Sequence, residues 1–186
     1  MARVFVITGP SGVGKGTLIR NLLSRVPTLE LSVSATTRKP RGDEQDGVHY
    51  HFLTDEEFAS KVAEGAFVEH ADYSGRRYGT LRSELERRTA DGAPVVLEIE
   101  VQGARQVRET LPDAVQVFIV PPSAEALRER LVGRGTDSPE DVERRLLVAE
   151  EELTARDEFQ YQVVNDRLED AVAELEQIVS RELPQR

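Results

Sequence analysis

The sequence predicts an α/β fold, a parallel sheet flanked by helices, and three observations support this prediction. Short apolar runs alternate with segments of helical spacing along most of the 186 residues. The runs "PVVLEIE" and "AVQVFIV" are almost continuously apolar, as expected for strands that are covered on both faces. Residues 35–81 break this rhythm with strands of alternating polarity, which indicates a lobe inserted into the main fold.

Apolar runs between turn residues predict the strands of the main sheet, which are Val4–Thr8, Leu31–Ala35, 94–100, 114–120 and Tyr161–Val164. Apolar residues at helical spacing and N-cap signals predict the helices, which are Thr17–Arg25, Leu81–Asp91, Ala104–Thr110, 123–133, 138–153 and 168–179. The inserted lobe should contain a strand at Tyr50–Leu53 and a helix that begins at a capping box of Thr54 and Glu57. The strand "AFVEHADY" and a turn at "SGRRYG" should follow that helix.

Composition limits the classes of function. The formal net charge is −10 and the chain has no basic stripe, so a nucleic-acid polymer is not an expected partner. The absence of cysteine excludes a disulfide framework, a zinc–thiolate site and a thiol nucleophile. No run of residues is apolar and long enough for a signal peptide or a membrane span, so we expect a cytoplasmic protein. No obligate protein partner is implied.

The strongest motif is "GPSGVGKGT", which follows the first predicted strand and opens the first helix. Glycines allow successive backbone N–H groups to converge on phosphate oxygens, and the helix N-terminus adds positive potential. Lys15 supplies a mobile positive charge. A glycine-rich turn with a surface lysine is the alternative, but the strand–loop–helix context favours a phosphate-binding loop, as in P-loop NTPases. The motif predicts contacts to nucleotide phosphates from Gly9, Pro10, Ser11, Gly12, Val13, Gly14, Lys15, Gly16 and Thr17.

Gly16 departs from the usual loop pattern, which has a hydroxyl residue directly after the lysine. That hydroxyl normally binds Mg²⁺, and here Thr17 offers one a position later. "GKGT" is similar to the loop of nucleoside monophosphate kinases of the adenylate kinase type. The departure therefore favours a small-molecule kinase, in which water and phosphates supply much of the Mg²⁺ shell, over a switch GTPase.

Two acidic residues, Glu98 and Glu100, lie two positions apart at the end of a predicted strand. They should project from one face at the carboxyl edge of the sheet, where open α/β sheets bind ligands. A solvated rim is the alternative. Opposite a phosphate loop, we expect Glu98 to serve Mg²⁺ through water and Glu100 to serve a substrate. His49 and His51 flank Tyr50, and we interpret them as strand residues of the lobe and not as metal ligands.

Several stretches together resemble the guanylate kinase family, over nearly the whole chain. The most specific are "VITGPSGVGKGT", "SVSATTRKPRGDEQDGVHYHF", "YGT", "LEIEVQGA", "GRGT" and "VVND". The resemblance implies transfer of the γ-phosphoryl group of ATP to GMP, with Mg²⁺, in purine nucleotide metabolism and GMP recycling. It also implies a core of residues 1–33, 82–123 and 157–186, a GMP-binding lobe at 34–81 and a small helical lid at 124–156.

The resemblance also assigns roles to residues. The GMP phosphate would be held by Arg38, Arg41, Tyr50 and Tyr78, and the guanine base would be surrounded by Ser34, Glu69, Thr80 and Glu100. Asn165 would lie near the adenine of ATP. The catalytic cations would be Lys15, Arg38 and the lid arginines Arg130, Arg134 and Arg145. The family commonly has Asp where this chain has Glu100.

Two alternatives remain at this point. A kinase of the same fold could use another acceptor, such as a phosphorylated ribose, although Ser34, Glu69 and Thr80 argue against it. A guanylate-kinase-like module could bind phosphorylated peptides without catalysis. Such modules have usually lost the phosphate loop, whereas this chain retains it together with the lid arginines.

Overall fold

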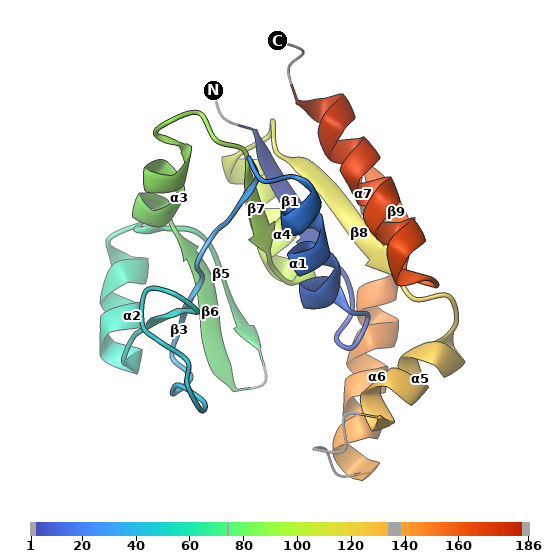
Figure 1. Cartoon of the computed structure of the whole chain (residues 1–186). Coiled ribbons are helices and arrows are strands. Elements are labelled where there is room, and N and C mark those ends of the chain that lie inside the picture. Colours follow the sequence, from blue (N-terminus) through green and yellow to red (C-terminus); the bar gives the residue numbers. More distant parts are fainter. Residues whose placement is uncertain (1–2, 74, 134–138, 184–186) are drawn as a thin grey trace.

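The main sheet of the computed structural model, which describes residues 3–73, 75–133 and 139–183, is parallel throughout and has the strand order β2-β7-β1-β8-β9. Its strands are β1 Val4–Thr8, β2 Glu30–Leu31, β7 Val95–Glu98, β8 Val115–Val120 and β9 Tyr161–Val164. β1 lies in the centre and pairs with β7 and β8 (Figure 1). The predicted α/β class is confirmed.

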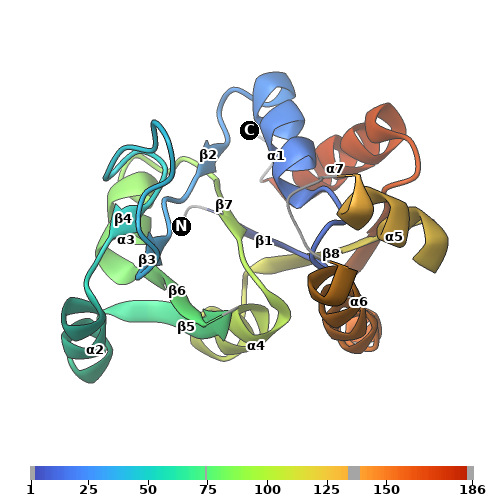
Figure 2. The ribbon, with the colours of Figure 1, turned by 90° about the horizontal axis from the view of Figure 1, so that it is seen from below.

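Helices cover both faces of this sheet (Figure 2). On one face, α1 (Lys15–Arg25) and α7 (Leu168–Glu182) enclose a core of aliphatic residues that includes Ile19, Leu22 and Leu175. On the other face, α3 (Arg82–Thr89) and α4 (Val101–Thr110) pack over Val6 and Leu97. The apolar stripes predicted for these helices therefore face the sheet, except at Leu168, which is 39% exposed.

The inserted lobe has its own sheet of order β4-β3-β6-β5. The strands are β3 Ala35–Thr36, β4 His51–Phe52, β5 Phe67–Tyr73 and β6 Arg76–Leu81, and helix α2 spans Asp55–Ala63. The capping box predicted at the start of α2 is present: Glu57 N–H donates to Thr54 Oγ1, and Thr54 N–H donates to the Glu57 carboxylate. Phe58 stacks on Phe67 beneath this sheet and forms the small core of the lobe.

Two predictions were wrong, one for a strand of the main sheet and one for a turn of the lobe. The expected strand Leu31–Ala35 is two short strands in different sheets, because the backbone changes partners between them. Ser32 N–H donates to Val96 O in the main sheet, whereas Val33 N–H donates to the carboxylate of Glu84. The expected turn at 74–79 is shorter, since β6 already begins at Arg76 and pairs antiparallel with β5.

The predicted lid contains α5 (Ala124–Val132) and α6 (Pro139–Leu153), which pack through Leu127, Leu131, Val142 and Ala149. Ser123 caps α5 by accepting from Ala126 N–H, as expected. The N-cap expected at Ser138 lies outside the described residues. After α6, a short 3₁₀ helix at Arg156–Glu158 leads to β9. Among the described helices, none combines the length and apolar character that a membrane span requires.

Candidate functional site

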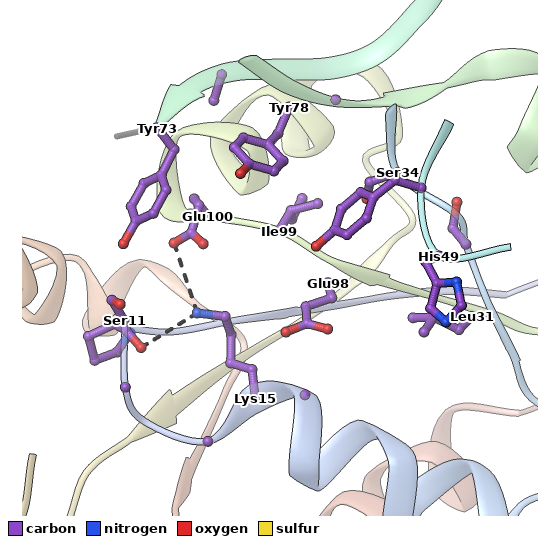
Figure 3. Close-up of a pocket in the computed structure, with 18 of the residues that line it drawn as sticks. Ser11, Lys15, Leu31, Ser34, His49, Tyr73, Tyr78, Glu98, Ile99 and Glu100 are labelled. Carbon is purple, nitrogen blue, oxygen red and sulfur yellow. Dashed lines mark hydrogen bonds and ion pairs between the residues drawn. The ribbon is translucent and has the colours of Figure 1, made fainter. Parts of the chain in front are cut away.

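A cavity of about 510 Å³ opens at the carboxyl ends of β1 and β7. Its floor is the loop 9–14 with the first turn of α1, and its opposite wall comes from β5 and β6 of the lobe (Figure 3). Open α/β sheets bind ligands at this edge, between the ends of neighbouring strands. The fold therefore brings the phosphate-loop motif and the lobe residues to one cavity.

Glycines give the loop its shape. Gly9, Gly12 and Gly14 have φ values of 147°, 86° and 98°, which residues other than glycine rarely adopt. A Cβ atom at Gly9 would also lie 2.5 Å from Ile119 O. Gly16, by contrast, is helical, and a Cβ atom there would make only ordinary contacts, at 3.6 Å from the Glu98 carboxylate. Neither the available space nor the backbone conformation therefore requires glycine at position 16 in place of a hydroxyl residue.

Lys15 extends from the first turn of α1 over the loop (Figure 3). Its Nζ donates to Gly9 O at 2.5 Å and to Pro10 O at 3.5 Å, and it lies 3.9 Å from Glu100 Oε2. The side chain is only 9% exposed and lines the cavity, so its positive charge faces the cavity and not bulk solvent.

Three carboxylates surround this lysine. Glu98 ends β7 and Glu100 is the N-cap of α4, so Glu100 does not lie on the strand as expected, although both line the cavity. Glu100 Oε2 is buried and has no hydrogen-bond donor among the described residues. Burial raises the pKa of Glu98, and Lys15 opposes that shift.

The third carboxylate, Glu152, comes from α6 and accepts from the loop N–H of Ser11 at 3.4 Å. Burial and the charge of Glu100 raise the pKa of Glu152 to about 8, although Lys15 opposes the shift. The loop therefore holds one carboxylate of the predicted lid at a backbone N–H group of the kind that binds phosphate oxygens.

The lobe contributes a buried carboxylate, Glu69, to the opposite wall. Its side chain is 3% exposed, and Thr80 Oγ1 donates to Glu69 Oε1 at 2.7 Å. Burial raises the pKa of Glu69 to about 7, and the hydrogen bonds with Thr80 oppose this shift. Ser34 and Glu100 line the same cavity, and Thr80 is buried beside Glu69, so the predicted base-contacting residues are brought together.

Of the predicted phosphate-binding residues of the lobe, Arg38, Arg41 and Tyr50 lie on the long loop between β3 and β4, and Tyr78 lies on β6. Arg41, Tyr50 and Tyr78 line the cavity, and the rings of the two tyrosines meet edge to face at 6.2 Å. Arg38 lies over the Tyr50 ring, 5.1 Å from its centroid, and makes two hydrogen bonds of 2.9 Å to Glu44. The hydrogen bond from Arg38 lowers the pKa of Glu44 to about 2. Arg38 is thus fixed at the edge of the site.

The predicted lid arginines occupy different positions. Arg145 lines the cavity, and its guanidinium donates to Ser11 Oγ at 2.7 Å. Arg130 donates to the backbone carbonyls of Val13 and Asn165, so it supports the loop from outside the cavity. Asn165 is also part of this support, because its side-chain amide donates to Val13 O at 2.8 Å. Arg134 lies outside the described residues.

Some residues of the site were not predicted. Tyr73 lines the cavity, and alternation along β5 could have identified it, since residues 69, 71 and 73 share one face. Glu44 and Glu152 had no local signal, because an acidic residue in a polar loop or on a charged helix is ordinary. Their roles depend on contacts that only the folded chain creates.

Comparison with known proteins identifies the family of this chain. The family model described as "Guanylate kinase" matches residues 1–182. A guanylate kinase of Synechococcus sp. (strain CC9311) is 54% identical over 176 residues, covering 95% of this chain and 93% of that protein. One of Synechocystis sp. is 52% identical, covering 97% and 94%.

A solved structure gives the same result. The crystal structure of guanylate kinase from Anaplasma phagocytophilum superposes with a TM-score of 0.80 at 31% identity, covering 99% of this chain and 87% of that one. The family model, the relatives and the solved structure agree, and the chain belongs to the guanylate kinase family.

Proposed function

We propose that this chain transfers the γ-phosphoryl group of ATP to GMP, giving ADP and GDP. Membership of the guanylate kinase family over residues 1–182 supports this reaction. The observation that carries it is the pairing, across one cavity, of a phosphate loop with Lys15 and a lobe carboxylate, Glu69. The first suits a polyphosphate donor, and the second suits a base that presents hydrogen-bond donors.

Glu69 is the proposed reader of guanine. Guanine presents N1–H and an exocyclic amine side by side, and a carboxylate can accept from both. Thr80 already donates to one oxygen of Glu69, which leaves the other lone pairs of the carboxylate available. Adenine offers an acceptor at N1 and a C–H at position 2, so it would leave a buried carboxylate without a donor, which is unfavourable. Ser34 is suited to donate to O6 of guanine.

Catalysis would consist of positioning and charge neutralisation. The acceptor phosphate has a second pKa of about 6 and is anionic near neutral pH, so no general base is required. The proposed cations come from separate segments: Lys15 from the loop, Arg38 and Arg41 from the lobe, and Arg145 from the lid. Arginine suits this task because its fork of donors matches phosphate oxygens. We propose supporting roles for Arg130 and Asn165, and a lid role for Arg134.

The residues at the cavity fit Mg²⁺ bound mainly through water and substrate. Mg²⁺ prefers oxygen ligands and retains several waters, so it needs few protein ligands. The Glu98 carboxylate and the Thr17 hydroxyl offer oxygens at the first turn of α1, and the orphaned Glu100 Oε2 can accept from a water or a substrate. Mg²⁺ would neutralise charge on the ATP phosphates, while Glu98 and Thr17 would hold its waters.

We further propose three parts with separate tasks: a core of 1–33, 82–123 and 157–186, a GMP-binding lobe of 34–81 and a lid of 124–156. The proposed cations lie on all three, so transfer would require the lobe and lid to close over both substrates, which also excludes water. Both substrates are small cytoplasmic metabolites, which supports a cytoplasmic location.

A coupled assay of ADP formation tests the reaction. We expect ATP with Mg²⁺ to support rapid turnover of GMP, slower turnover of IMP and at least about 10⁴-fold less efficient use of AMP. A phosphorylated ribose completes the panel and tests the alternative acceptor. Equal use of AMP and GMP would overturn the guanine assignment, and no transfer to any acceptor would overturn the proposed activity.

A further inference from the structure

Gly103 occupies the first turn of α4, where a glycine has no conformational advantage. Its φ is not in the left-handed region, and glycine within a helix is less favourable than alanine. The space around it is what distinguishes this position. A Cβ atom at Gly103 would overlap Glu69 Oε2 and would lie 3.0 Å from Glu69 Cδ. The missing side chain therefore makes room for a carboxylate from the lobe.

That carboxylate is confined on both of its oxygens. Glu69 Oε1 accepts from Thr80 Oγ1 at 2.7 Å, and Glu69 Oε2 lies against the Cα atom of Gly103. The side chain is 3% exposed and lines the cavity, so a carboxylate displaced from this position would move within the proposed base site. No salt bridge holds Glu69 within the described residues, and its position therefore depends on the shape of the surrounding wall.

The same helix also fixes the backbone on either side of Glu69. The Gln106 side-chain amide makes two hydrogen bonds with His70, accepting from its N–H at 3.1 Å and donating to its C=O at 2.7 Å. Thr110 Oγ1 lies 3.3 Å from Val68 O, and its shorter hydrogen bond, of 3.0 Å, goes to Gln106 O within the helix. Positions 103, 106 and 110 share one face of a helix. These contacts oppose sliding of β5 along α4, so we expect a side chain at position 103 to displace Glu69 and not the strand.

We propose that Gly103 is a specificity-determining positioning residue, whose lack of a side chain sets where the Glu69 carboxylate meets guanine. The proposal rests on the proposed function, because it takes Glu69 as the group that reads the base. Gly103 acts only through Glu69. It links a helix of the core to base selection in the lobe.

The variant Gly103→Ala tests this. Helix propensity predicts a gain in stability, whereas displacement of Glu69 predicts a loss of base specificity. Alanine should favour the helix, yet its methyl group must displace the carboxylate. We expect KM for GMP to rise about tenfold or more, and the preference for GMP over IMP and AMP to narrow. KM for ATP should change less than about twofold. Gln102→Ala, an exposed position on the same turn, is the matched control and should keep wild-type kinetics and specificity.

A double variant distinguishes displacement of Glu69 from general damage. Glu69→Ala removes the group that the methyl would contact. The double variant Glu69→Ala/Gly103→Ala should therefore have the same ratio of kcat/KM for GMP to kcat/KM for IMP as Glu69→Ala alone. Thermal unfolding gives a second readout that is independent of activity. If Gly103→Ala lowers the melting temperature or fails to fold, adding Glu69→Ala should restore stability. Failure of that rescue would overturn the proposal.

The outcomes separate the two proposals. Wild-type KM for GMP and wild-type base preference in a folded Gly103→Ala would overturn the role of Gly103 and leave the proposed activity intact. A wild-type protein that does not phosphorylate GMP would overturn the proposed activity. In that case the unfolding measurements on the single and double variants still decide whether Gly103 makes room for Glu69.

Discussion

Glu69 and Glu84 are both 3% exposed, but their surroundings are opposite. Glu69 faces the cavity and receives a hydroxyl hydrogen bond, and burial raises its pKa to about 7. Glu84 lies where the lobe joins the core and accepts from Arg87, Arg88 and the N–H of Val33. Burial alone would raise the pKa of Glu84, but the two arginines and this N–H lower it to about 2.

The difference in pKa between these two buried glutamates distinguishes a carboxylate suited to bind a ligand from one that stabilises the fold. A buried carboxylate that the protein itself pairs with cations stabilises the fold, and removing one partner is costly. A buried carboxylate without a cation is unfavourable in the free protein and is retained for a ligand that brings donors. Glu69, Glu98 and Glu152 all have raised pKa values. Glu69 and Glu98 line the cavity, and Glu152 accepts from the N–H of Ser11 in the loop that forms its floor. Glu84, in contrast, is linked through Arg88 to β2 and accepts from the N–H of Val33.

The largest expected effect tests the cavity side of this comparison through Lys15. Lys15→Met removes the cation that opposes the raised pKa values of Glu98 and Glu152. We expect kcat to fall by about 10²-fold or more, since losing one transition-state charge contact typically costs a few kcal/mol. The coupled assay measures this, with Lys61→Met, which is outside the cavity, as the control. Wild-type turnover by folded Lys15→Met would contradict the role of the loop.

A smaller effect on base selection is expected from Glu69→Gln. The amide cannot accept from both guanine donors with one group, so the preference for GMP over AMP should fall by about 10²-fold. The free energy of unfolding at pH 7 should stay constant or rise, because an unpaired buried carboxylate is removed. Asp72→Asn, on the same strand and exposed, is the control. Unchanged selectivity would show that another group reads the base.

Glu84→Gln should show the reverse pattern. The fold loses a charged partner of two arginines, and we expect the free energy of unfolding to fall by about 2–3 kcal/mol. Selectivity between GMP and AMP should not change. Urea denaturation measures the loss, and Glu86→Gln on the exposed side of α3 controls for helix effects. Equal stability of Glu84→Gln and wild type would erase the distinction between the two glutamates.

The smallest effect is a difference in the pH dependence of stability. Between about pH 4.5 and 7, folded Glu69 keeps a proton that the unfolded chain releases, so its contribution to stability falls as pH rises through this window. Glu84 has the opposite sign, because its contribution is present above about pH 4.5 and is lost as pH falls towards 2.

Denaturant unfolding from pH 5 to 8 tests the first of these slopes. The wild type should lose about 1–2 kcal/mol relative to Glu69→Gln as pH rises from 5 to 7.5. Parallel curves for the two proteins would mean that Glu69 titrates as an ordinary carboxyl. The slope attributed to Glu84 requires a matching comparison of wild type and Glu84→Gln between pH 5 and 2.5.

Sequence patterns predicted the parts of this molecule that depend on local chemistry. The strands Val4–Thr8 and Tyr161–Val164 are confirmed at both ends, and the capping box at Thr54 and the N-cap at Ser123 are present. These features depend on residues close together in the chain. The phosphate loop was predictable for the same reason, because its glycines are needed for backbone conformation.

Other features depend on distant partners and were not predictable in this way. The chain leaves the main sheet after Ser32, whose N–H still donates to Val96 O, because Glu84, far along the sequence, accepts from the N–H of Val33. Glu152 reaches the loop only because α6 folds back over it. Gly103 is informative only once Glu69 is seen against it. The residues of the base site came from resemblance to a family, since no pattern in the lobe indicates guanine.

The central position of β1 has a consequence for biosynthesis. Val4–Thr8 is made first, but its partners β7 and β8 follow about 90 and 110 residues later. At roughly 5–20 residues per second, β1 leaves the ribosome about 5–20 s before it can pair. The lobe, in contrast, pairs β3, β5 and β6 with one another, and all three are complete at Leu81. The inserted lobe can therefore complete its sheet before β7 and β8, the partners of β1 in the core, have been synthesised.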